Sequence, residues 1–171
     1  MRRGQSLPEV FVALGSNQGD PRRNVLQAME LLEKYSEHHL IRSSLWETQP
    51  VDCPPGSPAF VNAVVGIYPK EGETAKSLLQ KLQLLEREFG RMAKKLLNEP
   101  RPLDLDLISY GDQVLSTRNL ILPHPRAHLR SFVLKPLCEI APDLILPGCV
   151  KSVSQSLKDL APDDARRLND S

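Results

Sequence analysis

Two aspartates in the segment Leu103-Asp104-Leu105-Asp106-Leu107 are the side chains best placed to do chemistry. Successive side chains of a β-strand point to opposite faces, so the two carboxylates share one face and the three leucines share the other. Paired carboxylates repel each other unless a cation neutralises them, and hard cations such as Mg²⁺ prefer oxygen ligands. For an isolated Asp-x-Asp pattern, a solvated strand face is the plainer alternative.

The segment just before the aspartates is rich in positive charge, with Arg91, Lys94, Lys95 and Arg101. Arg101 stands between two prolines, which limits the freedom of its backbone. Carboxylates beside fixed positive charges are typical of a site for a nucleotide polyphosphate. We therefore expect metal-assisted phosphoryl chemistry here, with the loop 91–102 becoming ordered when substrates bind.

A second suggestive segment begins Pro123-His124-Pro125-Arg126 and continues to Phe132. The proline after His124 disfavours a helical face shared by His124 and His128, and therefore a metal site formed by this pair. A hydrogen-bonding or phosphate-binding role is favoured for His124 and Arg130, and a surface role for Arg126 and His128.

Hydrophobic periodicity predicts the elements that must position these residues. Strands are expected at 10–14, 40–48, 60–68 and 103–108, and a hairpin turn at 110–113 leading into 114–115. Asp20 and Pro21 open one helix, and Thr74 caps a longer one that Gly90 should end. The order predicts a ferredoxin-like βαββαβ sandwich, an antiparallel-rich sheet with helices packed on its face, followed by a C-terminal hairpin and short helices.

The 171 residues predict a single domain, with a core at about 9–148 and a polar tail at 149–171. With 22 basic and 21 acidic residues the net charge is +1, which gives no bulk reason to expect nucleic acid or an anionic membrane as partner. Cys53, Cys138 and Cys149 are an odd number without metal-finger spacing, so we expect reduced thiols and a cytoplasmic location.

Several motifs occur in an order that resembles one enzyme family, the 6-hydroxymethyl-7,8-dihydropterin pyrophosphokinases of folate biosynthesis. They are Leu14-Gly15-Ser16-Asn17, Thr48-Gln49-Pro50, Phe60-Val61-Asn62-Ala63, Glu86 before Gly90-Arg91, Arg101-Pro102-Leu103-Asp104-Leu105-Asp106 and Pro123-His124-Pro125-Arg126. The resemblance runs from about Val10 to Pro147.

This resemblance implies an ATP-dependent transfer of pyrophosphate to the hydroxymethyl group of the pterin, with release of AMP. Asp104 and Asp106 would hold two Mg²⁺ ions, and Arg91 and Arg101 would neutralise the transferred group. The implied partners are the small-molecule substrates, without nucleic acid or membrane, and the chain is expected to be a monomer.

The resemblance also implies two sets of binding residues. ATP would be bound by Gln83, Glu86, Lys94, Leu107, His124 and Arg130. The pterin would be bound by Thr48, Val51, Phe60, Asn62 and Phe132. An amide such as that of Asn62 offers both a donor and an acceptor to a heterocycle edge, and aromatic faces bury a flat ring.

Two other functions are compatible with part of this pattern. A different two-metal nucleotidyl or phosphoryl transferase would share the carboxylates but would not need Asn62 or the Pro-His-Pro-Arg segment. A ferredoxin-like nucleic-acid-binding module would need exposed aromatics and a basic sheet face, whereas the last strand offers Asp104 and Asp106.

Overall fold

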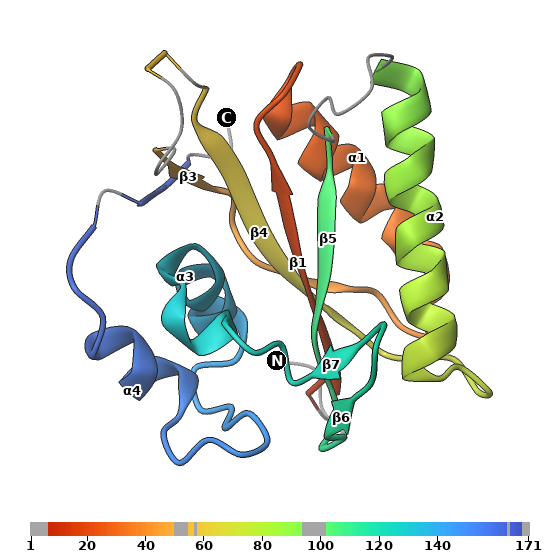
Figure 1. The fold of residues 1–171 in the computed structure, drawn as a ribbon, viewed down its shortest axis with the longest axis vertical. Helices are drawn as coiled ribbons and strands as arrows, with labels where there is room; N and C mark the ends of the chain where they lie inside the picture. Colours follow the sequence, from red (N-terminus) through yellow and green to blue (C-terminus); the bar gives the residue numbers. More distant parts are fainter. Residues whose placement is uncertain (1–6, 50–54, 57, 94–101, 164, 169–171) are drawn as a thin grey trace.

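The computed structural model describes residues 7–49, 55–56, 58–93, 102–163 and 165–168, and for 91–93 only the backbone. The mixed α/β fold is built on one antiparallel sheet with the strand order β5-β1-β4-β3-β8 (Figure 1). Its strands are β1 (Val10–Ser16), β3 (Trp46–Thr48), β4 (Phe60–Ile67), β5 (Asp104–Tyr110) and β8 (Arg166–Arg167), and the short β2 (Ile41–Arg42) also pairs with β4.

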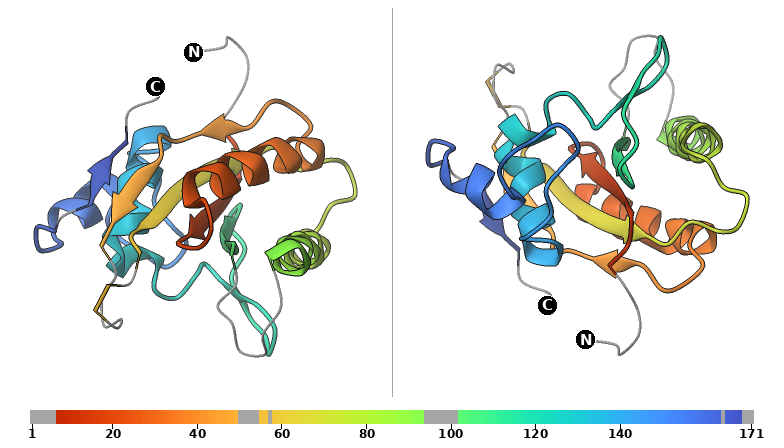
Figure 2. Two further views of the ribbon diagram at one scale, coloured as in Figure 1. Left: turned by 90° about the horizontal axis from the view of Figure 1, so that it is seen from above. Right: turned by 90° about the horizontal axis from the view of Figure 1, so that it is seen from below.

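The two faces of the sheet carry two different cores. Helices α1 (Pro21–Leu32) and α2 (Ala75–Ala93) cover one face, where their apolar stripes meet the inward residues of β1, β4 and β5. Helix α3 (Ser131–Ile140) packs on the other face, and α4 (Val153–Lys158) packs beside it (Figure 2). No helix in the described part of the chain is long and apolar enough to span a membrane.

Both predicted helix starts have the expected local chemistry. The Asp20 carboxylate accepts a hydrogen bond from the Arg23 backbone N–H at 3.1 Å, and Pro21 occupies the first turn of α1. The Thr74 hydroxyl accepts one from the Ser77 N–H at 3.0 Å at the start of α2. The predicted stop at Gly90 is wrong, because α2 continues to Ala93. Glycine inside a helix costs only about 1 kcal/mol, which tertiary packing readily offsets.

The predicted strand 40–48 is interrupted in its middle. The Ser43 hydroxyl accepts a hydrogen bond from the Val64 backbone N–H at 2.9 Å and donates to the carbonyl of Ser44 at 2.7 Å. A side chain therefore replaces a backbone group in the ladder, and the segment divides into β2 and β3.

The predicted hairpin after Tyr110 is only partly correct. The turn exists, since the Gln113 N–H donates to the Tyr110 carbonyl at 3.1 Å. However, β6 (Leu115–Ser116) pairs with β7 (Ile121–Leu122) and not with β5. The Thr117 backbone N–H donates to the Leu120 carbonyl at 3.0 Å and closes this later hairpin.

The predicted polar tail is largely structured. A capping box at Ser152 and Gln155 opens α4, whose Val153 is buried in the α3-side core. Farther on, β8 pairs with β3 at the edge of the sheet. Cys138 and Cys149 are free thiols, and Cys53 lies outside the described residues.

Candidate active site

A pocket of about 340 Å³ opens on the face of the sheet that α3 covers, at the N-terminal end of that helix. Alternation along β1, β4 and β5 directs the odd-numbered Val61, Ala63, Leu105 and Leu107 into the opposite core. Their neighbours therefore face the pocket. The lining residues from the sheet are Ala13, Leu14, Gly15, Thr48, Gln49, Phe60, Asn62, Asp104 and Asp106, and those from the α3 side are Arg130, Ser131, Phe132, Val133 and Asp163.

The polar wall of this pocket is built around Asn62, which is only 6% exposed. Its side-chain amide donates a hydrogen bond to the Thr48 hydroxyl at 3.0 Å, which fixes the orientation of the amide. Gly15 lies opposite in the β1–β4 register, and a Cβ there would stand 3.2 Å from the Asn62 side-chain oxygen. The glycine thus leaves space for the amide oxygen on the pocket side.

The apolar wall consists of Phe60 and Phe132, which face the pocket from β4 and from the first turn of α3. Phe132 is 37% exposed, which is unusual for a phenylalanine on a helix packed against a sheet. The Arg130 guanidinium lies 5.5 Å from the Phe132 ring centre, in a cation–π contact. The pocket therefore offers both a flat apolar surface and a fixed hydrogen-bonding edge, which suits a planar heterocycle.

The two aspartates lie on the pocket side of β5, as the alternation predicts. Asp104 pairs with Gly15 and Asp106 with Ala13 of β1, and both aspartates are exposed while Leu105 and Leu107 are buried. Helix α2 anchors the strand from behind, since the buried Glu86 carboxylate accepts a hydrogen bond from the Leu105 N–H at 2.7 Å. The strand that carries the carboxylates is thus held on both sides.

A second pocket of about 270 Å³ lies along the edge strand β5, between α2 and the β6–β7 hairpin. Asp106 lines this pocket and the first one, so the two pockets adjoin at that carboxylate. Of the residues predicted to bind ATP, Leu107 and His124 line it. Its other lining residues are Leu79, Leu105, Arg118, Asn119, Leu120, Ile121 and Pro125.

His124 is held in place by its neighbours. Its backbone N–H donates to the Ile108 carbonyl at 2.8 Å, and its Nδ1 accepts a hydrogen bond from the Arg126 N–H at 3.1 Å. Burial lowers the pKa of the ring, Asp106 offsets part of that effect, and Arg130 and Arg126 lower the pKa further. A neutral imidazole at physiological pH can donate a hydrogen bond from Nε2.

The remaining predicted residues are placed as follows. Gln83 is exposed on α2 and lines neither pocket, and Glu86 is occupied with β5. Val51, Lys94 and Arg101 lie outside the described residues, as does most of the loop 91–102, and only the helical backbone of Arg91 is described. Motif reasoning missed Arg118, Asn119 and Asp163, and no sequence signal distinguishes Asp163 from the rest of the tail.

The donor set fits a divalent cation that substrate phosphates complete. No group of three or more His, Cys, Asp or Glu side chains in the described ranges could hold a metal ion by itself. Mg²⁺, however, is usually bound through one or two carboxylates together with substrate phosphates and water. Asp104 and Asp106 provide such a pair of hard oxygen ligands at the junction of the two pockets.

Comparison with known proteins shows the family of the chain. Residues 11–142 match the family model described as 7,8-dihydro-6-hydroxymethylpterin-pyrophosphokinase. The chain is 36% identical over 163 residues to the 2-amino-4-hydroxy-6-hydroxymethyldihydropteridine pyrophosphokinase of Haemophilus influenzae, covering 93% of this chain and 97% of that protein. It is 39% identical over 142 residues to the protein of the same name from Pseudomonas aeruginosa, covering 82% and 85%.

Other similar proteins are longer. The chain is 36% identical to the folic acid synthesis protein fol1 of Pneumocystis carinii, covering 92% of this chain but only 21% of that protein. A crystal structure of a triple mutant of Plasmodium falciparum HPPK-DHPS has the same fold, with a TM-score of 0.69, 13% identity, and coverage of 91% of this chain and 42% of that chain. The chain belongs to the 7,8-dihydro-6-hydroxymethylpterin-pyrophosphokinase family.

Proposed function

We propose that this protein transfers pyrophosphate from ATP to the hydroxymethyl group of 6-hydroxymethyl-7,8-dihydropterin in folate biosynthesis, releasing AMP. The observation that carries the proposal is the pair of adjoining pockets with Asp106 in both walls. In the reaction the pterin hydroxyl oxygen forms a bond to the β-phosphorus, the bond from that phosphorus to the oxygen of AMP breaks, and the hydroxyl proton is released.

The first pocket is the proposed pterin site. The amide of Asn62, oriented by Thr48, pairs with the aminopyrimidinone edge, and Phe60 and Phe132 enclose the ring. Val51 is proposed for this site on the resemblance alone. Holding the hydroxymethyl group near Asp104 and Asp106 supplies the proximity on which a displacement between two bound substrates depends.

The second pocket is the proposed nucleotide site. Leu107 and His124 line this pocket and provide apolar contact and a donor for the phosphates, respectively. Arg130 lines the adjoining first pocket and is proposed to provide further donors to the phosphates from there. Lys94 is assigned to the phosphates by the resemblance, as Arg91 and Arg101 are to the charge on the transferred group. Gln83 is proposed for the adenosine side on the same basis, whereas Glu86 acts by holding β5 in place.

Asp104 and Asp106 would hold the two proposed Mg²⁺ ions. When bound, such ions neutralise charge on the transferring phosphoryl group and orient it for in-line displacement. The protein's own contribution is the fixed placement of the carboxylates on β5, with α2 behind the strand and β1 beside it.

The strand order β5-β1-β4-β3 supports a ferredoxin-like sandwich with α3 and β8 added. The single sheet shared by both cores supports one domain over 1–171. A monomer in the cytoplasm is proposed from the sequence.

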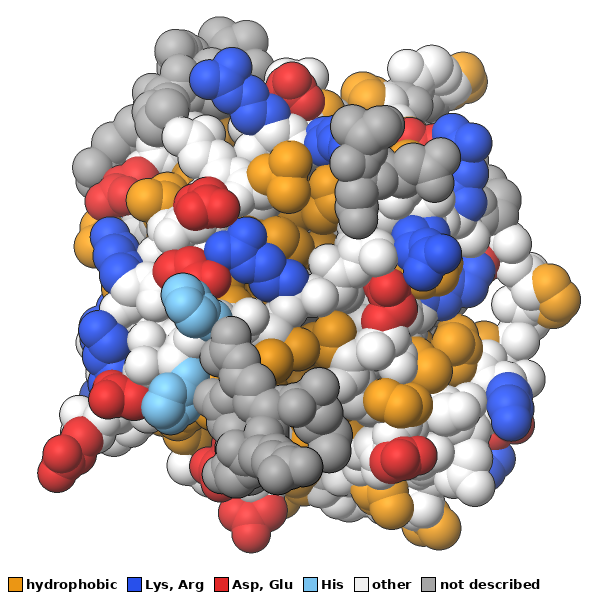
Figure 3. Space-filling view, turned by 180° about the vertical axis from the view of Figure 1, so that it is seen from behind, with side chains coloured by type: hydrophobic (Ala, Val, Ile, Leu, Met, Phe, Trp, Pro, Cys, Tyr) orange, Lys and Arg blue, Asp and Glu red, His pale blue; other side chains and the backbone are white. Residues whose placement is uncertain are grey.

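The alternative functions have less support. On the face shown in Figure 3, basic and acidic side chains are interspersed, which does not favour nucleic acid as partner. A different phosphoryl transferase would not account for the pocket around Asn62, which suits a planar heterocycle.

The function is tested by measuring AMP release from ATP and Mg²⁺ with and without the hydroxymethyl-dihydropterin. We expect AMP only when the pterin is present, in equal amount to the pterin diphosphate. AMP release that is independent of the pterin, or release of ADP, would instead indicate another phosphoryl transferase.

A further inference from the structure

Asp163 and the segment 165–168 contact two different walls of the proposed pterin pocket. On one side, β8 pairs with β3 in the register Trp46↔Arg167 and Glu47↔Arg166. The Leu168 N–H then donates to the Leu45 carbonyl at 2.8 Å. Strand β3 ends at Thr48, which faces the pocket and holds the amide of Asn62. This segment is therefore fixed to the strand that bears the polar wall.

On the other side, Asp163 forms hydrogen bonds with the N-terminal part of α3. One of its carboxylate oxygens accepts hydrogen bonds from Lys135 Nζ at 2.6 Å and from the Ala165 N–H at 3.1 Å, and the other accepts one from the Ser131 hydroxyl. Lys135 Nζ also donates to the Ala165 carbonyl at 3.1 Å. Ser131 and Lys135 are four residues apart and share one face of the helix, so a single carboxylate reaches both.

The start of α3 depends on this contact more than most helix starts would. Its N-cap residue, Arg130, makes no capping hydrogen bond with its side chain. A negative charge beside the first turn of a helix is favourable, and Asp163 provides one. Burial raises the pKa of Asp163, but the hydrogen bonds from Lys135 and Ser131, together with that from Ala165, outweigh burial and lower it, so the carboxylate is charged near neutral pH.

We propose that Asp163 is a positioning residue for the pterin. Through Ser131 and Lys135 it holds the start of α3, so that Phe132 stays at the distance across the pocket that a flat ring requires. This inference rests on the proposed function, because it assigns the ligand of the same pocket. Asp163 itself lines the pocket but has its hydrogen bonds directed to α3 and to its own segment. It also lies beyond residues 11–142, the part of the chain that the family model matches.

The test compares Asp163→Ala, Lys135→Met and the double variant with the unaltered chain. Lys135 Nζ lies 5.8 Å from the centre of the Trp46 ring, and methionine keeps an apolar side chain of similar length there while removing the charge and its hydrogen bonds to Asp163 and Ala165. The matched control is Asp159→Ala, which removes another carboxylate of the C-terminal region that pairs with a lysine, Lys151, but does not line the pocket. Binding of the pterin and of a non-hydrolysable ATP analogue is titrated separately for each variant.

We expect each single variant to weaken pterin binding about tenfold, the scale of one lost hydrogen bond to a charged group. The double variant should bind the pterin about as well as Asp163→Ala alone, because Lys135 acts through the Asp163 carboxylate that this variant already lacks. Binding of the ATP analogue should stay within about twofold of that of the unaltered chain, because residues that are far apart and share no contacts act independently. The control should bind both ligands normally.

Three results would overturn the proposal. Unchanged pterin binding in Asp163→Ala would remove the role altogether. Additive losses in the double variant would mean that Asp163 acts without Lys135, and equal losses for both ligands would mean a general structural role. If the unaltered chain itself released no pterin-dependent AMP, the proposed function would fail first. An active unaltered chain with normal pterin binding in Asp163→Ala would refute only this inference.

Discussion

At the scale of single residues, the charge of Asp106 matters most because this carboxylate borders both pockets. Asp106→Asn keeps the size of the side chain and removes the charge that a metal ion requires. We expect the rate of AMP release to fall on the order of a thousandfold, which corresponds to an activation barrier several kcal/mol higher. The midpoint of thermal unfolding should be nearly unchanged, because the side chain is exposed.

The matched control for Asp106 is Asp112→Asn, in the turn that follows the same strand. Its carboxylate lines neither pocket, and activity should be normal. Activity within a few-fold of normal in Asp106→Asn would contradict the metal assignment.

Asn62 should distinguish the two substrates. In Asn62→Ala the heterocycle edge loses its partner, and an unpaired buried polar group costs about 1–3 kcal/mol. We expect that loss in pterin binding measured by titration, with little change for an ATP analogue. Asn119→Ala in the second pocket should show the reverse pattern. Loss of both ligands in Asn62→Ala would make the residue structural.

At the scale of elements, α2 supports β5 through one buried contact. Glu86→Leu leaves the Leu105 N–H without its acceptor, and we expect the free energy of unfolding in urea to fall by about 1–3 kcal/mol. Glu88→Leu, on the exposed side of the same helix, should change it by less than about 0.5 kcal/mol. Normal stability with weakened ATP binding in Glu86→Leu would restore the predicted nucleotide role.

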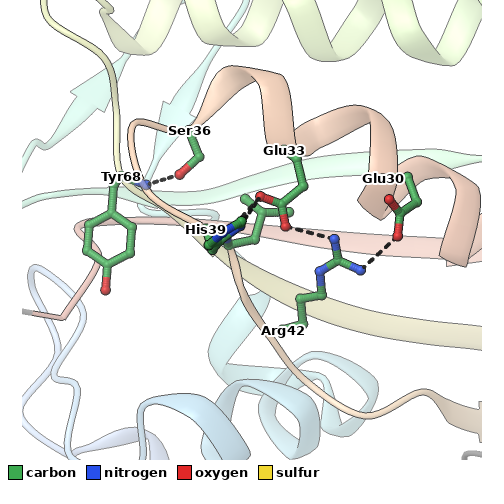
Figure 4. A network of polar contacts seen from close by, with 7 residues as sticks. Glu30, Glu33, Ser36, His39, Arg42 and Tyr68 are labelled. Atoms are coloured by element: carbon green, nitrogen blue, oxygen red, sulfur yellow. Dashed lines mark hydrogen bonds and ion pairs between the residues drawn. The ribbon is translucent and has the colours of Figure 1, made fainter. Parts of the chain in front are cut away.

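The turn from α1 into β2 is held by an ionic network that should depend on pH (Figure 4). Arg42 contacts Glu33 at 2.7 Å and Glu30 at 3.4 Å. Burial raises the pKa of Glu33, but Arg42 and the Leu40 N–H lower it more, to below its usual 4.5. A lowered carboxyl pKa stabilises the fold above pH 4.5, and that contribution is lost as the pH falls through the folded-state value.

Arg42→Gln should therefore cost about 0.5–1 kcal/mol of unfolding free energy near neutral pH, the usual size for a surface ion pair. The difference from the unaltered chain should shrink in urea titrations below pH 4.5. Arg87→Gln on α2 removes an exposed arginine of the same kind and serves as the control. A difference that stays constant down to strongly acidic pH would exclude the network as its cause.

At the scale of the whole molecule, the proposed pterin pocket is lined by β3, β4, β5 and α3, so a ligand bound there should stabilise the entire fold. A ligand at about 100 times its dissociation constant adds about 2.7 kcal/mol. For a chain of this size we expect the unfolding midpoint to rise by roughly 5–10 °C in calorimetry. Asn62→Ala at the same pterin concentration should show a smaller rise, and an equal rise would place the ligand elsewhere.

The helix starts and the faces of the paired aspartates were predictable because their signals are short in range. Alternation over 103–107 sets the faces of Asp104 and Asp106, and the caps at Asp20 and Thr74 are made within three residues. The motifs of the family were likewise readable from the order of residues along the chain, and the family was confirmed.

Other features depended on partners that the chain brings together only when folded. Gly90 does not stop α2, Ser43 replaces a backbone group in the ladder, and Leu115 pairs with β7. The largest case is Asp163, which the sequence leaves in a polar tail. Its contacts to Ser131 and Lys135 cross about thirty residues of chain. No periodicity or cap encodes such a pairing, because its free energy depends on the packing of β8 beside β3 and of α3 on the sheet.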